Sequence, residues 1–331
     1  MISFPNKAKI EKLKQLVRNA LNQHIDRDYV LLDVPNYRNI GDTLIWQGEL
    51  EYLKELPHKC LYSCNPYTFK DSKIPNNAII LLQGGGNFGD VWGVNQKFRN
   101  EIVKKFPNNK IIVLPQTIHY QKEDNLIKDS ELFNAHKNLI LCVRDEISYK
   151  IAKDRFASCE TYLLPDMAFF NDFSMFHTNK INNRTLLIKR VDKELGDTEL
   201  IKNTLIANNV KNIEIQDWPG FYEQGTLKRK IQVLYNIIET KGSEKLKNTP
   251  FKFLVDDVHG LKRRDYKDYN IRKGIEFINQ YDVIYSTRLH GFILAVLLNK
   301  EVYIFDNSYG KNKNFFNAWL SDFDNVKLIS K

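Results

Sequence analysis

The sequence predicts an α/β protein in which two Rossmann-like halves face each other across a cleft. Short apolar runs rich in Val, Ile and Leu alternate with stretches of helical periodicity, a pattern typical of mostly parallel sheets covered on both faces. A length of 331 residues also exceeds what one hydrophobic core usually supports. We therefore expect two domains of similar construction.

The predicted strands fall into two groups separated by a polar, Asn-rich stretch at 170–184. The first group is "YVLLDV" (29–34), "KCLYSC" (59–64), "AIILLQ" (78–83), "KIIVLPQ" (110–116), "LILCVRD" (139–145) and "ETYLLPD" (160–166). The second is "RTLLIKR" (184–190), "NIEIQDW" (212–218), "FKFLVDDVH" (251–259), "DVIYSTR" (282–288) and "EVYIFDN" (301–307). This grouping predicts an N-terminal domain over residues 1–170, a linker over 171–184 and a C-terminal domain over 185–331.

The composition restricts the partners and the compartment. The net charge of +9, from 49 Lys and Arg against 40 Asp and Glu, favours phosphorylated small molecules, nucleic acid or an anionic membrane as partners. High lysine and asparagine usage in an AT-rich genome explains the same charge equally well. The four cysteines lack the spacing of a zinc site, so we expect reduced, mostly buried thiols in a cytoplasmic protein.

The N-terminal segment "MISFPNKAKIEKLKQLVRNALNQ" has apolar residues at helical spacing, broken by lysines. It lacks the apolar core of a signal peptide, and no run of about eighteen apolar residues occurs in the chain. The sequence therefore predicts neither membrane crossing nor export by a classical signal. The amphipathic helix either packs against its own domain, which we favour, or lies on a membrane surface.

Residues that directly follow apolar strands are candidates for a site, because ligands of open parallel sheets bind at the carboxyl ends of strands. The first such loop, "NYRNIGD" (36–42), contains Asn36, Asn39, Gly41 and Asp42. Gly41 permits a tight turn. Asp42 either caps a helix predicted to begin near it or accepts the proton of an acceptor hydroxyl.

The second loop, "QGGGNFGD" (83–90), contains Gly84, Gly85, Gly86 and Asn87. Three consecutive glycines indicate either a sharp turn or a close approach of the backbone to a ligand or another segment. The order differs from G-x-G-x-x-G, which weakens a dinucleotide site, and the P-loop pattern is absent. Gln116 follows at the end of the next strand and joins this set of cleft candidates.

Two arginines end predicted strands. Arg144 lies beside Asp145 and is either paired to its acidic neighbours or directed into the cleft. Arg190 ends the first strand of the second group. An arginine in such a place offers a bidentate donor for phosphate or carboxylate.

The segment "YSTRLHG" (285–291) joins a predicted strand to a fully apolar predicted helix. Its last residues, Arg288, Leu289, His290 and Gly291, occupy the helix entry, where backbone N–H groups and the helix dipole attract an anion. The local pattern thus predicts an anion-binding site.

These motifs occur in an order that resembles the polysaccharide pyruvyl transferase family. The order is N-x-G-D, "GGGN", "LPQT", "RD" with a serine, "PD", and "S-x-R-L-H-G" before an apolar helix, from about residue 36 to about residue 307. The resemblance implies a GT-B-like arrangement of the two domains, with the acceptor on the N-terminal side and the donor on the C-terminal side. It further implies phosphoenolpyruvate as donor, and a sugar acceptor in capsule, exopolysaccharide or cell-wall biosynthesis.

The resemblance also implies roles for particular residues. It places Arg288, Leu289 and His290 at the phosphoenolpyruvate site, and we add Gly291 to them. A further donor-binding arginine is expected upstream, with Arg144 and Arg190 as the candidates. His290 is expected to be the general acid or to protonate the departing phosphate, and Arg288 to neutralise the charge on that phosphate.

No cofactor and no metal are expected. Asp256, Asp257 and His259 lie close together in the sequence, but the two aspartates point to opposite faces of a predicted strand and cannot easily bind one metal ion.

The main alternative enzyme is a GT-B glycosyltransferase that uses a nucleotide sugar. A nucleic-acid-binding protein is a weaker alternative, because "KRRDYKDY" (262–269) mixes acidic residues with its basic ones. The expected acceptor is a sugar on a polyprenyl diphosphate carrier, with peripheral contact to the inner membrane face; the identity of the sugar and the oligomeric state are left open.

Overall fold

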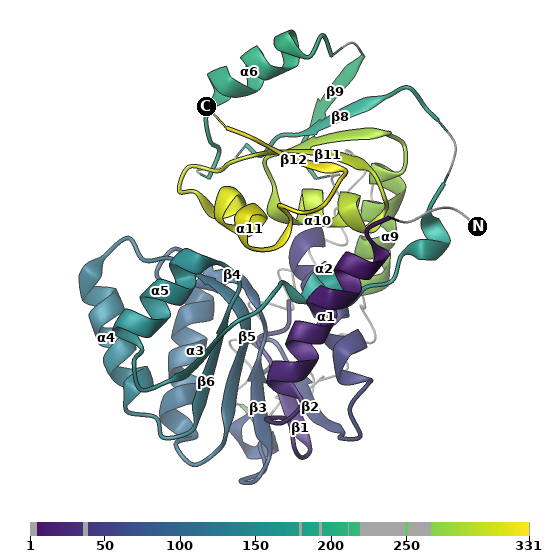
Figure 1. Cartoon of the computed structure of the whole chain (residues 1–331). Helices are drawn as coiled ribbons and strands as arrows, with labels where there is room; N and C mark the ends of the chain where they lie inside the picture. The colour runs from purple at the N-terminus through teal and green to yellow at the C-terminus, as the bar shows by residue number, and fades with distance from the viewer. Residues whose placement is uncertain are drawn as a thin grey trace.

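The computed structural model describes residues 5–35, 39–178, 181–191, 194–210, 212–218, 249–250 and 266–330. These residues form a seven-stranded and a five-stranded sheet, each accompanied by helices (Figure 1). Every strand pair within them is parallel. The predicted α/β class with two mostly parallel sheets is confirmed, and the segment predicted as linker lies between the last strand of one sheet and the first strand of the other.

The first sheet has the order β2-β1-β3-β5-β6-β7, and β4 pairs with β5 beside this path. Six of its strands were predicted, whereas the glycine-rich β4 was not. The strands are β1 (Tyr29–Leu32), β2 (Cys60–Cys64), β3 (Ile79–Leu82), β4 (Gly85–Phe88), β5 (Ile111–Ile118), β6 (Leu139–Val143) and β7 (Glu160–Leu163).

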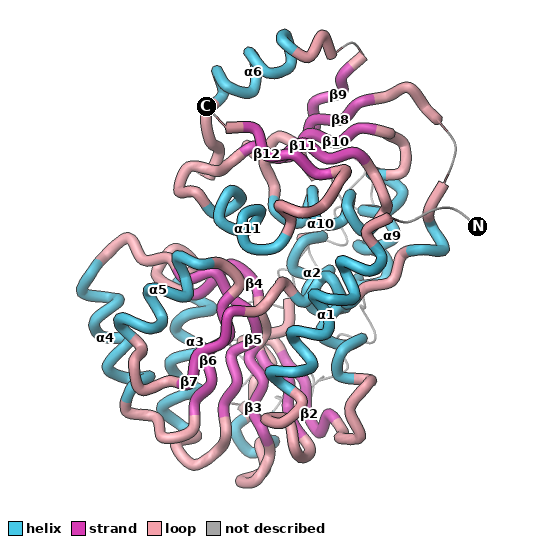
Figure 2. The backbone as a smooth tube through the Cα atoms, in the orientation of Figure 1, coloured by secondary structure: helices cyan, strands magenta, loops and turns pink. Residues whose placement is uncertain are grey.

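Helices cover both faces of this sheet, as the near-continuous apolar runs require. Along β1, Val30 and Leu32 join the core that includes α3, α4 and α5, while Tyr29 and Leu31 join the core that includes α1 and α2. Figure 2 shows the strands between these two groups of helices. The helices are α1 (Lys7–Leu21), α2 (Ile40–Leu53), α3 (Gly93–Lys105), α4 (Glu123–Asn134) and α5 (Glu146–Arg155).

The second sheet has the order β12-β11-β10-β8-β9. The predicted strand at 251–259 lies outside the described residues, and β12 was not predicted. The strands are β8 (Thr185–Ile188), β9 (Ile213–Gln216), β10 (Val283–Ser286), β11 (Glu301–Phe305) and β12 (Val326–Ile329). The helices are α6 (Thr198–Ala207), α9 (Tyr266–Ile278), α10 (Leu289–Leu297) and α11 (Lys311–Trp319).

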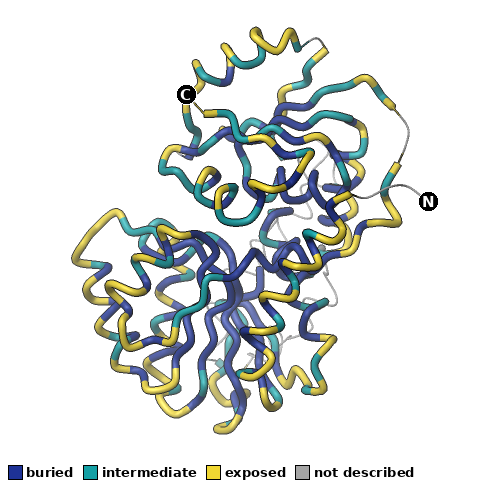
Figure 3. The backbone as a smooth tube through the Cα atoms, in the orientation of Figure 1, coloured by how far each residue is buried: buried dark blue, intermediate teal, exposed yellow. Residues whose placement is uncertain are grey.

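The two sheets share a hydrophobic core through α1 and α2. Ile40 and Leu44 of α2 belong to the same buried cluster as Phe292 of α10 and Ile275 of α9. Figure 3 shows this junction as a buried region between the sheets. The loops at the carboxyl ends of both sheets are therefore held against each other by packed side chains.

The N-terminal helix packs against its own chain, as we favoured from the sequence. Ile10 and Leu13 contact the core of the second sheet, and Val17 and Leu21 contact the core of the first. Leu16, which the periodicity placed on the same apolar face, is 45% exposed. No helix among the described residues combines the length and the apolarity needed to cross a bilayer.

The four cysteines are unpaired thiols, and all but Cys60 are buried. Burial raises the pKa of the Cys159 thiol to about 12 and raises those of Cys64 and Cys142 further. The expectation of mostly buried thiols is confirmed.

Candidate active site

A cavity of about 530 Å³ lies between the carboxyl ends of the two sheets. Loops from both halves of the chain line it, which is where the topology of parallel sheets places a ligand. The predicted site residues that line it are Asn39, Asp42, Gly86, Asn87, Arg144, Arg190, Arg288, Leu289 and His290. The residues predicted for the site that are not part of this lining are Gly41, Gly84, Gly85, Gln116 and Gly291. Asn36 lies outside the described residues.

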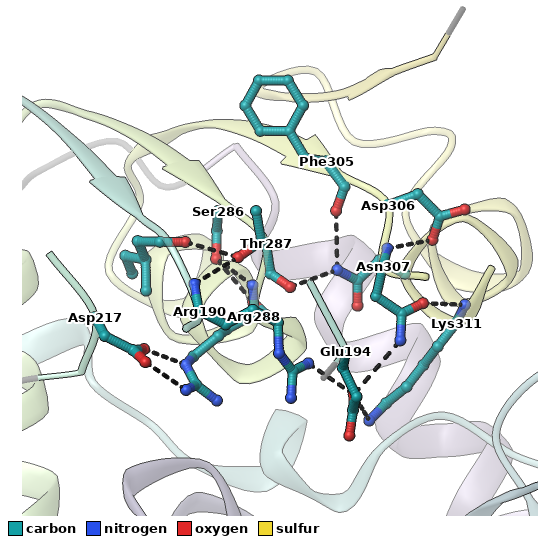
Figure 4. Close-up of polar contacts among 12 residues, drawn as sticks. Arg190, Glu194, Asp217, Ser286, Thr287, Arg288, Phe305, Asp306, Asn307 and Lys311 are labelled. Carbon is teal, nitrogen blue, oxygen red and sulfur yellow. Dashed lines mark hydrogen bonds and ion pairs between the residues drawn. The ribbon is translucent and has the colours of Figure 1, made fainter. Parts of the chain in front are cut away.

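The second sheet brings Arg190 and Arg288 to one edge because β10 pairs with β8, with Ser286 opposite Ile188. The backbone N–H of Arg190 donates to the Thr287 hydroxyl at 3.0 Å, which fixes the two loops to each other. Arg288 makes a two-pronged contact with Asp217, in which Nη2 donates at 2.6 Å (Figure 4). Arg190 Nη1 donates to Glu194 Oε2 at 2.7 Å.

Lys311, the first residue of α11, adds a cation that sequence reasoning missed. Its ammonium lies 3.8 Å from Glu194 Oε2. Figure 4 shows the two side chains facing each other. Burial lowers the pKa of Lys311 to about 8; Glu194 opposes this shift, and Arg144 and Arg190 reinforce it. The cavity wall thus carries more positive charge than Glu194 alone neutralises.

Arg144 is fully buried and joins the two halves of the site. Its Nε donates to Thr117 Oγ1 at 3.0 Å and its Nη1 donates to Asp166 Oδ2. Its Nη2 has no hydrogen-bond partner among the described residues. Of the two interpretations left open by the sequence, the pair with the adjacent acids is wrong: Asp145 instead caps α5 by accepting from the Ser148 N–H at 2.8 Å.

Asp166 also contacts His290, whose Nε2 lies 3.3 Å from the same Oδ2 atom. Burial alone would raise the pKa of Asp166, but Arg144 and His290 outweigh it and hold that pKa below its ordinary range. A permanent carboxylate therefore bridges an arginine of the first half and the histidine of the second.

The first turn of α2 lies against His290. A Cβ on Gly41 would lie 2.5 Å from His290 Nδ1, so only glycine allows the helix to approach the imidazole this closely. The helix begins at Ile40, earlier than predicted, and Asn39 is its cap because Asn39 Oδ1 accepts from the Gly41 N–H at 2.9 Å. The prediction that Asp42 caps this helix is wrong: its carboxylate accepts from Asn39 Nδ2 at 2.7 Å.

The glycine loop forms β4, which lies along β5. Gln116 is fully buried beneath it, where its amide donates to Gln83 O at 2.8 Å and to Asn87 Oδ1 at 3.1 Å. A Cβ on Gly86 would stand 2.9 Å from both Arg144 Nη2 and Lys311 Nζ. These two cationic nitrogens therefore converge on one point of the cavity, directly above the glycine.

Gly84 and Gly291, also predicted for the site, make contacts within the protein. The Gly84 N–H donates to Glu49 Oε1 at 2.7 Å, and burial raises the pKa of Glu49 well above its ordinary value. A Cβ on Gly291 would lie 2.6 Å from Ser286 Oγ, so this glycine lets α10 pack against β10. Asp256, Asp257 and His259 lie outside the described residues, and the absence of a metal stays a prediction.

Known proteins resemble this chain in sequence or in fold. A family model described as polysaccharide pyruvyl transferase matches residues 39–309. A Bacillus subtilis (strain 168) protein named "Putative pyruvyl transferase EpsO" is 34% identical over 305 residues, which cover 91% of this chain and 88% of that protein. "Pyruvyl transferase 1" of Schizosaccharomyces pombe is 28% identical over 307 residues, 88% of this chain and 69% of its own.

A crystal structure of an uncharacterised protein from Klebsiella pneumoniae aligns over the whole of both chains with a TM-score of 0.59 and 19% identity, which supports the fold. The family match spans most of the sequence and includes Arg144, Arg190 and Arg288, which line the cavity. Lys311 lies two residues beyond the end of the match. The chain therefore belongs to the polysaccharide pyruvyl transferase family and is a pyruvyltransferase.

Proposed function

We propose that this enzyme transfers the pyruvyl group of phosphoenolpyruvate to two hydroxyls of one sugar in a polysaccharide precursor, forming a cyclic ketal and releasing phosphate. The convergence of Arg144 Nη2 and Lys311 Nζ above Gly86 carries the proposal. Arg190 and Arg288 line the same cavity. Phosphoenolpyruvate has a carboxylate and a phosphate on a three-carbon frame, and such a compact polyanion requires several cations held close together.

Helix entries add to this donor site. Arg288 precedes α10 and Lys311 begins α11, so the N-termini of both helices lie at the cavity. Backbone N–H groups at such ends favour anions. Arg288 is already paired with Asp217, so a bound phosphate would share this guanidinium with the carboxylate.

The proposed reaction begins with a proton that adds to the methylene carbon of the donor and makes C2 electrophilic. One sugar hydroxyl then forms a bond to C2, the bond from C2 to the phosphate oxygen breaks, and the second hydroxyl closes the ketal. One of the two hydroxyl protons replaces the proton consumed in making the methyl group, and the other leaves with the phosphate. No cofactor or redox step is required for this balance.

We assign the proton donor to His290, because this imidazole lines the cavity and faces the ionised Asp166. The contact with the carboxylate fixes the orientation of the ring. Asp42, at the start of α2, also lines the cavity and is the proposed acceptor for a sugar hydroxyl proton.

Phosphate release tests this proposal. The purified enzyme, given phosphoenolpyruvate and a panel of acceptor glycans, is expected to release phosphate and to increase the mass of one glycan by one pyruvate ketal. Release of UDP or GDP from a nucleotide sugar, without consumption of phosphoenolpyruvate, would instead identify a glycosyltransferase and overturn the proposal.

The pH dependence of donor use should report Lys311. Because its pKa lies at about 8, the ammonium loses its charge above this pH, and kcat/KM for phosphoenolpyruvate should fall by up to about tenfold per pH unit. Lys311→Met should lack this alkaline limb and show a low, flat profile. A wild-type limb that persists in Lys311→Met would assign the titration to another group.

The same shift has a consequence for stability. In the unfolded chain lysine titrates near 10.5, so between pH 8 and 10.5 the unfolded state binds more protons and the folded state gains stability as pH rises. At pH 7 the charged Lys311 therefore costs stability, at most about 3 kcal/mol. Lys311→Met should unfold at a higher denaturant concentration than the wild type while it turns over more slowly.

We further propose that the acceptor is lipid-linked and that the enzyme contacts an anionic membrane surface. The net charge of +9 supports this proposal. The enzyme is expected to co-sediment with vesicles that contain phosphatidylglycerol and to dissociate as salt is raised. Equal recovery in the supernatant with anionic and with neutral vesicles would contradict the membrane contact.

A further inference from the structure

One wall of the cavity differs in chemistry from the cationic site. It consists of two segments of the first half, residues 65–67 after β2 and residues 91–95 at the entry to α3. Trp92 is 50% exposed and Val94 is 55% exposed, although both line a cavity. Large apolar side chains at such a place favour a ligand with an apolar face of its own.

We propose that this wall, formed by residues 65–67 and 91–95, is a subsite that binds one neutral pyranose ring of the acceptor, with the ring stacked on Trp92. The proposal rests on the pyruvyl transfer proposed above and names the place of its second substrate. The C–H bonds on one face of a pyranose are weakly positive, and the face of an indole is electron-rich, so the two surfaces attract each other as well as excluding water.

The wall has no positively charged side chain that would attract an anion. None of its lining residues has a charged side chain: they are Asn65, Pro66, Tyr67, Val91, Trp92, Gly93, Val94 and Asn95. Among the residues that the structure describes, the Arg and Lys side chains that line the cavity lie elsewhere, at Arg144, Arg190, Arg288 and Lys311. The cavity therefore offers a polyanion and a neutral ligand separate surfaces.

Polar groups on the wall match sugar hydroxyls, which both donate and accept hydrogen bonds. Asn65 Oδ1 accepts from the Tyr67 N–H at 2.8 Å and the Thr68 N–H at 3.1 Å, while its Nδ2 donates to no other described residue. Asn95 Nδ2 donates to Asp33 Oδ1 at 2.8 Å, while its Oδ1 accepts from no described residue. The Tyr67 hydroxyl likewise has no hydrogen-bond partner in the described part of the chain.

The internal hydrogen bonds also fix the orientation of these amides before a sugar arrives. In Asn65, the side-chain oxygen is occupied by two backbone N–H groups, so the side-chain NH2 group is available to donate to a ligand. In Asn95, the NH2 group is occupied by Asp33, so the side-chain oxygen is available to accept. Asp33 itself is held by the buried Arg99, at 3.4 Å. Such preorganised groups lose little entropy on binding.

The wall also lies suitably for the reaction. Asn87, at the end of the glycine loop, lines the cavity together with Asp42, and Gly86 precedes it at the point where Arg144 and Lys311 converge. A sugar on the aromatic wall can thus present hydroxyls to Asp42 and to the donor carbon within one continuous cavity.

Binding of simple sugars tests the subsite separately from catalysis. The probes are methyl pyranosides of galactose, glucose, mannose and N-acetylglucosamine, measured by saturation-transfer NMR on the whole enzyme. We expect at least one to bind, Trp92→Ala to weaken it about tenfold or more, and Trp92→Phe to retain affinity within about threefold. Met175→Ala, at an 81% exposed residue away from the cavity, is the matched control and should bind as the wild type does.

Calorimetry with phosphoenolpyruvate separates this inference from the proposed function. Donor affinity should stay within about twofold in every variant. The inference is overturned if the wild type binds phosphoenolpyruvate but none of the pyranosides, if Trp92→Ala binds the sugar normally, or if Trp92→Ala loses donor affinity to the same extent. A wild type that binds a pyranoside on Trp92 but no phosphoenolpyruvate would uphold the subsite and refute the donor assignment.

Discussion

Asp166→Asn is expected to lower the free energy of unfolding by roughly 3–5 kcal/mol and kcat by roughly 10²–10⁴-fold. Asparagine keeps the shape of the side chain but removes the charge that Arg144 and His290 share. Arg144 would then be a buried cation that has lost its carboxylate partner, and His290 would lose the carboxylate that orients its ring. Denaturant unfolding and steady-state kinetics measure the two losses.

Asp145→Asn is the matched control for Asp166→Asn. Asp145 is also a buried aspartate, but it caps α5, and asparagine caps helices nearly as well. Asp145→Asn should lower the free energy of unfolding by about 1 kcal/mol or less, with kcat nearly unchanged. Combining Asp166→Asn with Arg144→Met should restore part of the stability, because the cation without a partner is removed, and none of the activity. If Asp166→Asn is as stable and as active as Asp145→Asn, the bridge has no such role.

Gly86→Ala is expected to raise KM for phosphoenolpyruvate by roughly a hundredfold while the fold remains intact. The added methyl group would stand 2.9 Å from Arg144 Nη2 and from Lys311 Nζ, in the place proposed for the anion. Losing two hydrogen bonds to charged groups costs about 3 kcal/mol or more, which corresponds to roughly this factor. The free energy of unfolding should change little, because the added methyl group would first meet the ends of the long Arg144 and Lys311 side chains.

Gly93→Ala provides the comparison for Gly86→Ala. A Cβ at Gly93, the first residue of α3, would meet nothing within 4 Å, so KM for the donor should not change. An unchanged KM in Gly86→Ala as well would place the phosphoenolpyruvate anion elsewhere in the cavity.

The sequence predicts the sheets well because apolar strands and the loops after them are local patterns. It misses β4, since Gly85–Phe88 has little intrinsic β propensity and is a strand only through its pairing with β5. Lys311 follows the β11 strand at the carboxyl edge, so the rule about strand ends could have found it. Its lowered pKa could not have been found, because that depends on Arg144 and Arg190 from other loops.

Asp166 shows a different limit. The "PD" motif marks it in the sequence, but its role depends on Arg144 and on His290, residues that meet only when the two sheets pack together. The capping of α2 was misassigned for a local reason, since Asn39 and Asp42 are both good caps and only the geometry distinguishes them. The aromatic wall was overlooked because neither Tyr67 nor Trp92 lies in a motif with a recognisable chemistry.

The pairing of β4 with β5 changes the meaning of the three glycines at 84–86. A glycine run in a free loop must lose a large conformational entropy when a ligand arrives. Here the hydrogen-bonded ladder and the buried Gln116 amide have already imposed that order during folding. The glycines would thus give the proposed anion room without giving the backbone freedom, so that the entropic cost would fall on the folding equilibrium and not on the affinity for substrate.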